Sequence, residues 1–239
     1  MIKFSIKKPE TGTAASLVFL LFLFACSPLK QYRDLPDVVK WEPDIARFEA
    51  LDKTESYPTD AIMFAGSSSI RLWSSLMTDM YPYNVIQRGY GGARLSDFAV
   101  YAGRIFSPHK CSALVLFVAN DITGGNADKS PEEVRDLFSL VHKTFRKTNP
   151  GKAVFYIGIT PTRSRWQAWP AIKQSNDLIR EWCEKKDNTW YIDTEAAFLN
   201  SNGEPKEELF RDDKLHLNAE GYKVWTDIIK AELDKVFLN

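Results

Sequence analysis

A short apolar run that leads into three consecutive serines is the first stretch of this sequence suited to chemistry. The apolar residues 61–64 are followed by Gly66 and by serines at positions 67–69, and amphipathic sequence starts at Ile70. This pattern predicts a buried strand that passes through a tight turn into a helix. The free N–H groups at the start of such a helix, with its dipole, favour negative charge nearby. A serine there is suited to attack an ester, although a serine-rich helix cap without chemistry would look the same.

A second group of reactive residue types lies near the other end of the sequence, where Asp212 and Asp213 precede His216. An imidazole can take the proton of a serine hydroxyl, and a carboxylate on the other ring nitrogen fixes its tautomer. Asp213 is three residues before His216, so one loop can present both, and Asp212 is the alternative partner. We expect His109 to lie in a solvated loop and His142 at the boundary of an apolar helix face.

The elements that must position these groups follow from the alternation of apolar runs with amphipathic stretches. Strands are expected at residues 61–66, 84–88, 112–118, 153–159 and 190–193, and helices at about 70–79, 96–106, 131–147, 169–186 and 218–236. The run 112–118 is apolar except at its first residue, as is typical of a strand buried on both faces of a parallel sheet. Alternating strands and helices predict a three-layer α/β/α sandwich with a five-stranded parallel sheet.

Ligands bind beyond the carboxyl ends of the strands in such folds, so the residues that follow each strand are the candidates for a site. Besides the serines, these include the glycine-rich turn that ends at Gly92, the pair Asn120 and Asp121, and the polar and aromatic residues after the fourth strand. A glycine N–H and an asparagine carboxamide are suitable donors to the oxyanion formed in ester hydrolysis. Each feature alone has a structural explanation, but their order at successive strand ends argues against coincidence.

These motifs, taken in order, resemble those of the SGNH hydrolases (GDSL-type esterases and lipases) from about Ala61 onward. The residues that carry the resemblance are Gly66-Ser67-Ser68, Gly92, Asn120 and Asp213-x-x-His216. The resemblance implies a flavodoxin-like fold in which Ser68 is the nucleophile, His216 the base and Asp213 its orienting partner. It also implies that Gly92 and Asn120 donate to the oxyanion together with the Ser68 N–H. The family members that look most similar are the platelet-activating-factor acetylhydrolase-like enzymes and carbohydrate acetylesterases.

Two positions depart from the pattern of that family. Ser67 stands in place of the aspartate of Gly-Asp-Ser, and Val118 stands in place of the glycine of Gly-x-Asn-Asp. Because Ser67 and Ser69 flank Ser68, either of them is an alternative nucleophile. The Gly-x-Ser-x-Gly elbow of the α/β-hydrolases does not fit, since Ile70 occupies the position of its second glycine.

The start of the sequence has the composition of a secretion signal. An uncharged apolar block at residues 14–25 follows three basic residues, Lys3, Lys7 and Lys8. The block is shorter than the ~20 residues of a membrane-spanning helix and suits the apolar region of a signal peptide. The run Leu23-Phe24-Ala25-Cys26 resembles the lipobox of bacterial lipoproteins, in which the cysteine is acylated. An ordinary cleaved signal peptide, with Cys26 incidental, is the alternative.

We therefore expect three segments. Residues 1–26 would be a lipoprotein signal peptide, residues 27–57 a tether with a short packing helix, and residues 58–239 the hydrolase domain. The protein would be secreted across the inner membrane and held in the bacterial cell envelope by a lipid on Cys26, its only contact with a membrane.

Composition excludes several other classes of function. Lysine plus arginine and aspartate plus glutamate both number 31, so no net charge indicates a nucleic-acid partner. The spacing typical of zinc sites does not occur, and we expect neither a metal nor another cofactor. Cys111 and Cys183 are expected to be buried free thiols rather than a disulfide.

The sequence thus predicts a serine esterase that removes short acyl groups, above all acetyl, through an acyl-serine intermediate. Trp166, Trp169 and Arg163 follow the fourth strand and are candidates to bind a sugar or another small ester substrate. An acyltransferase or a phospholipid-type acylhydrolase would use the same chemistry. A glycan-binding lipoprotein without catalysis is the alternative from another class.

Overall fold

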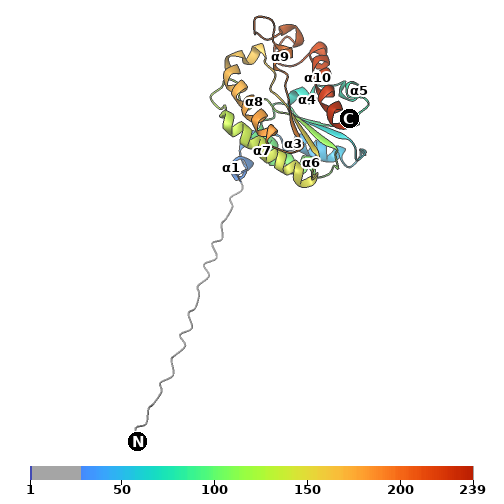
Figure 1. Ribbon diagram of the computed structural model, residues 1–239, viewed down its shortest axis with the longest axis vertical. Helices are drawn as coiled ribbons and strands as arrows, with labels where there is room; N and C mark the ends of the chain where they lie inside the picture. The colour runs from blue at the N-terminus through green and yellow to red at the C-terminus, as the bar shows by residue number, and fades with distance from the viewer. Residues whose placement is uncertain (2–27, 239) are drawn as a thin grey trace.

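The computed structural model describes Met1 and residues 28–238, and five parallel strands form the sheet at its centre. The strands are β1 (Ile62–Gly66), β2 (Val85–Gly89), β3 (Ala113–Phe117), β4 (Ala153–Ile157) and β5 (Thr189–Ile192). They lie in the order β2-β1-β3-β4-β5, with every neighbouring pair parallel. Helices cover both faces (Figure 1), so the predicted α/β/α sandwich with a five-stranded parallel sheet is confirmed.

Helices of very different length surround this sheet. The short helices are α1 (Lys30–Arg33), α2 (Pro36–Val39), α3 (Glu42–Leu51), α4 (Ser68–Arg71), α5 (Leu76–Asp79) and α9 (Glu195–Phe198). The long helices are α6 (Leu95–Phe106), α7 (Pro131–Thr148), α8 (Trp169–Glu184) and α10 (Ala219–Phe237). Side chains mark where two of the long helices begin: Ser130 Oγ accepts the N–H of Glu133 in α7, and Asn218 Oδ1 accepts the N–H of Gly221 in α10.

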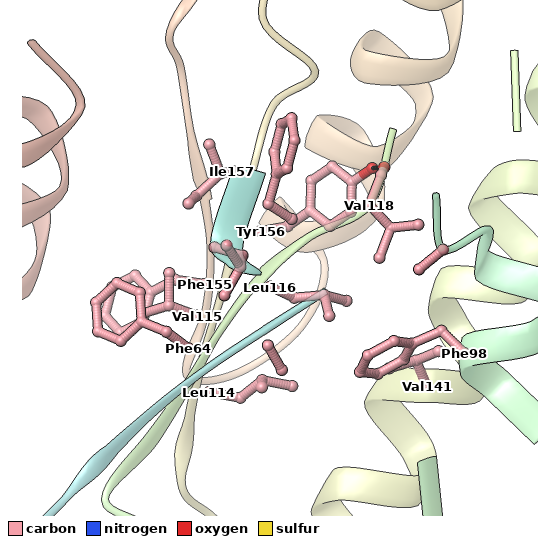
Figure 2. Close-up of a cluster of buried hydrophobic side chains, with 14 of the residues drawn as sticks. Phe64, Phe98, Leu114, Val115, Leu116, Val118, Val141, Phe155, Tyr156 and Ile157 are labelled. Atoms are coloured by element: carbon pink, nitrogen blue, oxygen red, sulfur yellow. Dashed lines mark hydrogen bonds between the residues drawn. The ribbon is translucent and has the colours of Figure 1, made fainter. Parts of the chain in front are cut away.

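The core lies on both faces of the central strand β3, which is buried along its whole length. Leu114 and Leu116 face Phe98 of α6 and Val141 of α7, whereas Val115 faces the opposite layer together with Phe64 and Phe155 (Figure 2). In that second layer Trp225 of α10 packs edge-on against Phe117, with ring centroids 4.7 Å apart. Burial of apolar side chains on both faces fixes β3 in the middle of the sheet and holds its carboxyl end rigidly.

The predicted continuous helix at residues 70–79 is wrong, because the chain forms α4 and α5 with a break between them. The break buries Trp73 completely, and its ring stacks on Tyr222 of α10 at a centroid distance of 5.2 Å. Trp73 Nε1 also donates to Asp79 Oδ2 at 2.6 Å. A straight helix would present Trp73 in a fixed rotation about its axis, and the packing against α10 overrides that local preference.

The predicted solvated position of His109 is also wrong. Its side chain is buried, and Nε2 lies 3.0 Å from Asp52 Oδ1, which also accepts from Arg88 Nη2. These partners come from segments far away in the sequence, so the local loop composition did not indicate them. The prediction for the cysteines is confirmed, since Cys111 and Cys183 are buried free thiols.

The segment before the sheet packs on the domain through three short helices. α1, α2 and α3 all contact α6, and Ile45 and Phe48 of α3 are buried in the core. Arg104 of α6 holds α3 by ion pairs to Glu42 and Glu49. The expected signal peptide, residues 1–26 with Cys26, lies outside the described residues. Within residues 28–238 no helix has the length and apolar character needed to span a membrane.

Candidate active site

The serine turn is held at the carboxyl end of β1 by a close approach to β3. Gly66 has φ = +137°, and a Cβ on it would lie 1.8 Å from the Phe117 carbonyl oxygen, so no other residue fits without moving the strand. The next residue, Ser67, donates its backbone N–H to that carbonyl at 2.9 Å. The chain then enters α4 at Ser68, whose own N–H is among the first groups of the helix without an intrahelical acceptor.

Of the three serines, Ser68 is the one that reaches a base. Ser67 and Ser69 are buried, with 1% and 8% of their surface exposed, whereas Ser68 is half-buried and lines a cavity. Ser68 Oγ lies 2.9 Å from His216 Nε2. The geometry therefore distinguishes Ser68 from the two alternatives that the sequence left open.

The histidine is carried by the loop that precedes α10. The loop is closed by an antiparallel bridge between Phe210 and Leu217 and by a hydrogen bond from Arg211 N–H to the His216 carbonyl at 2.8 Å. His216 Nδ1 lies 2.7 Å from Asp213 Oδ2. Among the described residues Asp213, and not Asp212, is the carboxylate that contacts this imidazole.

Hydrogen bonds fix the charge state of Asp213. Burial alone would raise its pKa, but the His216 side chain and the backbone N–H groups of His216 and Leu215 donate to the carboxylate and lower the pKa to about 2. An ionised carboxylate only accepts, so Nδ1 of His216 carries the hydrogen. In the neutral ring Nε2 is then an acceptor, and the Ser68 hydroxyl donates to it. This is the arrangement needed for removing the serine proton.

Asn120, at the carboxyl end of β3, has its carboxamide held on both sides. Nδ2 donates to the Ala93 carbonyl at 2.8 Å, and Oδ1 accepts from Arg165 Nη2 at 2.6 Å. An amide nitrogen has two hydrogens, so one remains for a ligand.

Gly92, the other predicted donor, precedes Ala93 with φ = +71° and is exposed. It does not line the cavity at Ser68. The structure therefore brings Asn120 to the cavity directly and Gly92 only to its neighbourhood.

The cavity beside Ser68 is small. Its volume is about 30 Å³, and its apolar wall includes Phe117, Ile159, Leu217 and Trp225. A void of about 10–15 Å³ holds one water, so this one has room for a group of a few atoms such as the methyl of an acetyl. Thr162 also lines it, and among the described residues its buried hydroxyl oxygen has no hydrogen-bond partner.

The candidate substrate residues lie beside this cavity rather than in it. Trp166 and Arg163 line a groove of about 370 Å³, which shares Arg165 with the cavity as a lining residue. Arg163 pairs with Glu207 at 2.9 Å. Trp169 is only 8% exposed and stacks on Trp166 with ring centroids 5.9 Å apart. Trp169 therefore serves packing, whereas Trp166 and Arg163 remain accessible to a ligand in the groove.

Sequence reasoning missed Arg165 and Thr162 as lining residues. Both follow β4, so the strand-end rule indicated the segment but could not rank its members. The ranking depends on the 3₁₀ turn Arg163–Ala168, inside which Arg165 leaves helical geometry (φ −118°, ψ 19°). Within residues 28–238 no three His, Cys, Asp or Glu side chains are grouped as a metal site.

Comparison with known proteins places this geometry in context. The sequence profile of the GDSL-like lipase/acylhydrolase family matches residues 54–224. No curated protein sequence matches the chain. Among solved structures, the chain is similar to a Streptococcus pneumonia protein described as a platelet activating factor (TM-score 0.72, 15% identity, 82% of this chain and 94% of that chain covered). It is also similar to a GDSL-like lipase from Bacteroides thetaiotaomicron, with a TM-score of 0.67 and 14% identity over 81% of this chain and 98% of that chain. A carbohydrate esterase family 3 protein from Talaromyces cellulolyticus is similar with a TM-score of 0.59 and 17% identity over 74% of this chain and 97% of that chain.

Proposed function

The chain belongs to the GDSL-like lipase/acylhydrolase family, and from that membership we propose that it removes short acyl groups, above all acetyl, from carbohydrate hydroxyls. It is a hydrolase that acts on ester bonds. One observation carries the finer proposal: Ser68 Oγ lies 2.9 Å from His216 Nε2, and His216 Nδ1 lies 2.7 Å from Asp213 Oδ2. Ser68 and His216 both line a cavity of about 30 Å³.

In the proposed first step, Ser68 Oγ attacks the ester carbonyl carbon while its proton passes to His216 Nε2. Asp213 accepts from Nδ1 throughout and stabilises the imidazolium that forms. The carbonyl oxygen becomes an oxyanion that accepts from the Ser68 N–H and from the free hydrogen of Asn120 Nδ2. By resemblance to the family, the Gly92 N–H is the third donor. Each donor is expected to lower the barrier by about 3–4 kcal/mol.

In the second half of the cycle, the tetrahedral intermediate collapses and His216 gives its proton to the leaving alcohol oxygen. The acyl group remains on Ser68 as an ester. Water then enters, His216 takes one of its protons, and the resulting attack releases the acid and restores the serine. Asp213 carries its negative charge through both halves.

The size of the cavity supports short acyl chains, and the neighbouring groove supports a sugar as the alcohol. The half-buried indole of Trp166 offers an apolar face in the groove, and Arg163 offers donors for hydroxyl groups. Similarity of fold to a protein described as a carbohydrate esterase agrees with this assignment.

The test is the hydrolysis of p-nitrophenyl esters of increasing chain length by the wild type and by Ser68→Ala. We expect the wild type to cleave the acetate ester with the highest kcat/KM. Its kcat/KM for the octanoate ester should be at least about 10-fold lower, because each methylene that the cavity excludes costs about 1–3 kcal/mol. The Ser68→Ala variant should cleave neither ester. Acetylated xylo-oligosaccharides are the next substrates. A preference for octanoate would contradict the short-acyl proposal, and turnover by Ser68→Ala would contradict the assigned nucleophile.

We also propose that Cys26 carries the lipid that anchors the protein to the cell envelope, on the strength of the apolar block and the lipobox-like run before it. The mass of the N-terminal peptide from protein expressed in a bacterium tests this. Diacylglyceryl cysteine is expected at residue 26. An unmodified N-terminus in a soluble periplasmic fraction would contradict the anchor and leave an ordinary signal peptide.

A further inference from the structure

The side chain of Arg165 reaches the carboxyl end of β3 from the turn after β4. Nη2 donates to Asn120 Oδ1 at 2.6 Å, and Nη1 donates to the carbonyl of the preceding residue, Ala119. The guanidinium thus spans two consecutive residues of one strand end, next to Ser68 in the same cavity. Few geometries of a planar, rigid fork satisfy both acceptors, so the contact fixes Arg165 and Asn120 relative to each other.

This contact decides which way the Asn120 carboxamide faces. A guanidinium has donors only, so the amide oxygen must point to Arg165. The NH₂ group must then point the other way, towards the Ala93 carbonyl, which only accepts. The flipped amide would set donor against donor on one side and acceptor against acceptor on the other. Arg165 and Ala93 together therefore keep the amide hydrogens directed to the side on which the substrate carbonyl binds.

The guanidinium of Arg165 forms no ion pair with any carboxylate in residues 28–238. Among the described residues no carboxylate lies within 4.0 Å of its guanidinium, although Asp128 and Asp121 act on it from further away. Burial lowers the pKa of Arg165, but an arginine side chain stays protonated in proteins. By contrast, the more deeply buried Arg88 is paired with Asp52 at 2.5 Å. Arg165, which is half-buried, therefore keeps its positive charge directly beside the Asn120 amide oxygen.

We propose that Arg165 is a positioning residue of the oxyanion site: it holds the Asn120 carboxamide in its donating orientation, and its charge on the amide oxygen makes the amide hydrogens stronger donors. The two bonds fix the orientation of the amide, and the charge reaches the oxyanion only by polarising that amide. The inference rests on the proposed function, because it needs Asn120 to donate to an oxyanion. It predicts an effect that passes through Asn120 and is felt in the transition state more than in substrate binding.

A double-mutant cycle on p-nitrophenyl acetate hydrolysis tests this. Arg165→Met is expected to lower kcat about 10- to 100-fold with KM changed less than about 3-fold, and Asn120→Ala to lower kcat about 100- to 1,000-fold. Because Arg165 acts through Asn120, the double variant should be within about 3-fold of Asn120→Ala alone. Losses that multiply, or a raised KM with kcat preserved, would overturn the proposal, the second by showing that Arg165 binds substrate.

Controls separate this role from a structural one. Arg180→Met removes another half-buried arginine, paired with Asp193 far from the cavity, and should leave kcat unchanged. Arg165→Lys keeps the charge but loses the fork, so its kcat should fall between those of the wild type and Arg165→Met. If Arg165→Met does not fold, as judged by its thermal unfolding, Arg165→Lys takes its place in the cycle. A kcat of Arg165→Lys equal to that of the wild type in the folded protein would overturn the positioning role.

The same data distinguish the failure of this inference from failure of the proposed function. If the folded wild type shows no turnover that depends on Ser68, the esterase proposal falls and the role of Arg165 falls with it. If the wild type is active and the cycle is additive, the esterase proposal stands and only the inference about Arg165 is overturned.

Discussion

Two histidine–carboxylate pairs lie at opposite ends of the strands, and only one of them faces a hydroxyl group. His216 and Asp213 follow the sheet at its carboxyl edge, and Nε2 of the ring contacts Ser68 Oγ in a cavity. His109 precedes β3 at the amino edge, and its Nε2 contacts Asp52 instead. The pairing itself is therefore not what makes a histidine reactive. The difference lies in the ring nitrogen that the carboxylate leaves free and in the group that this nitrogen contacts.

The carboxylates of the two pairs are also used differently. Asp213 is exposed and receives two backbone N–H groups in addition to the imidazole, so its charge is directed to the ring. The Asp52 side chain is only 8% exposed, and its carboxylate is shared with the guanidinium of Arg88 at 2.5 Å. The first arrangement leaves the imidazole able to gain a proton, whereas the second uses the carboxylate to neutralise a buried cation. One pair suits chemistry and the other suits stability.

The largest expected difference is in the response of the two histidines to alanine substitution. His216→Ala should lower kcat/KM for p-nitrophenyl acetate at least about 10⁴-fold, because among the described residues no other base contacts Ser68 Oγ, with little change in thermal unfolding. His109→Ala should keep kcat/KM within about 3-fold but lower the unfolding temperature, since it removes a buried ring. Equal activity of the two variants would remove the distinction between the two pairs.

The two carboxylates should also differ, with Asp213 affecting activity and Asp52 affecting stability. Asp213→Asn is expected to lower kcat about 10³- to 10⁴-fold, because an amide can donate to the ring and favour the wrong tautomer. Asp52→Asn should leave kcat nearly unchanged and cost about 3–5 kcal/mol in the free energy of unfolding, because Arg88 is left buried without a full counter-charge. Urea unfolding together with kcat for both variants checks this. A stable Asp52→Asn protein would show that Arg88 finds another partner.

A smaller effect is expected from the hydroxyl of Thr162, which lines the cavity and has no partner among the described residues. Thr162→Val removes the hydroxyl at nearly constant volume. If the hydroxyl bonds the substrate, kcat/KM for p-nitrophenyl acetate should fall by a factor of about 5, the equivalent of one hydrogen bond, while the protein is no less stable. Thr226→Val is the matched control in α10, where the hydroxyl donates to the Tyr222 carbonyl, and it should leave kcat/KM unchanged. Unaltered kinetics in both would restrict the site to the residues around Ser68.

The smallest expected effect concerns the pH dependence of stability at the amino edge. Burial lowers the pKa of His109, so the unfolded chain binds a proton more readily than the folded one. Stability is therefore lost as the pH falls below the ordinary histidine value of ~6.5. His109→Gln should lose less unfolding temperature between pH 7 and pH 5 than the wild type does. His142, whose pKa burial lowers to about 4, should give a larger effect of the same sign in His142→Gln.

The elements that could be predicted from the sequence are those fixed by local composition. All five strands lie within two residues of their predicted ends. Three of them, β1, β3 and β4, are almost entirely apolar, and β2 and β5 each contain a shorter apolar stretch beside a turn. The strand-end rule brought Ser68 and Asn120 to one edge, and the structure places both of them around one cavity with His216. Parallel topology converts sequence order into spatial proximity, and for this reason the weak motifs were informative together.

The features that could not be predicted depend on partners far away in the sequence. The break between α4 and α5 follows from Trp73 packing on Tyr222 of α10. The burial of His109 follows from Asp52 and Arg88. The difference between Arg163 and Arg165, two residues apart, depends on one non-helical residue in a 3₁₀ turn. None of these has a local signal, because each arises from tertiary packing.

The most direct test of the central claim is to locate the reactive serine. The protein would be treated with a fluorophosphonate, digested, and mapped by mass spectrometry, beside His216→Ala and His109→Ala. One adduct is expected, on Ser68, formed by the wild type and by His109→Ala but not by His216→Ala. An adduct on Ser67 or Ser69, or equal labelling in His216→Ala, would contradict the central claim.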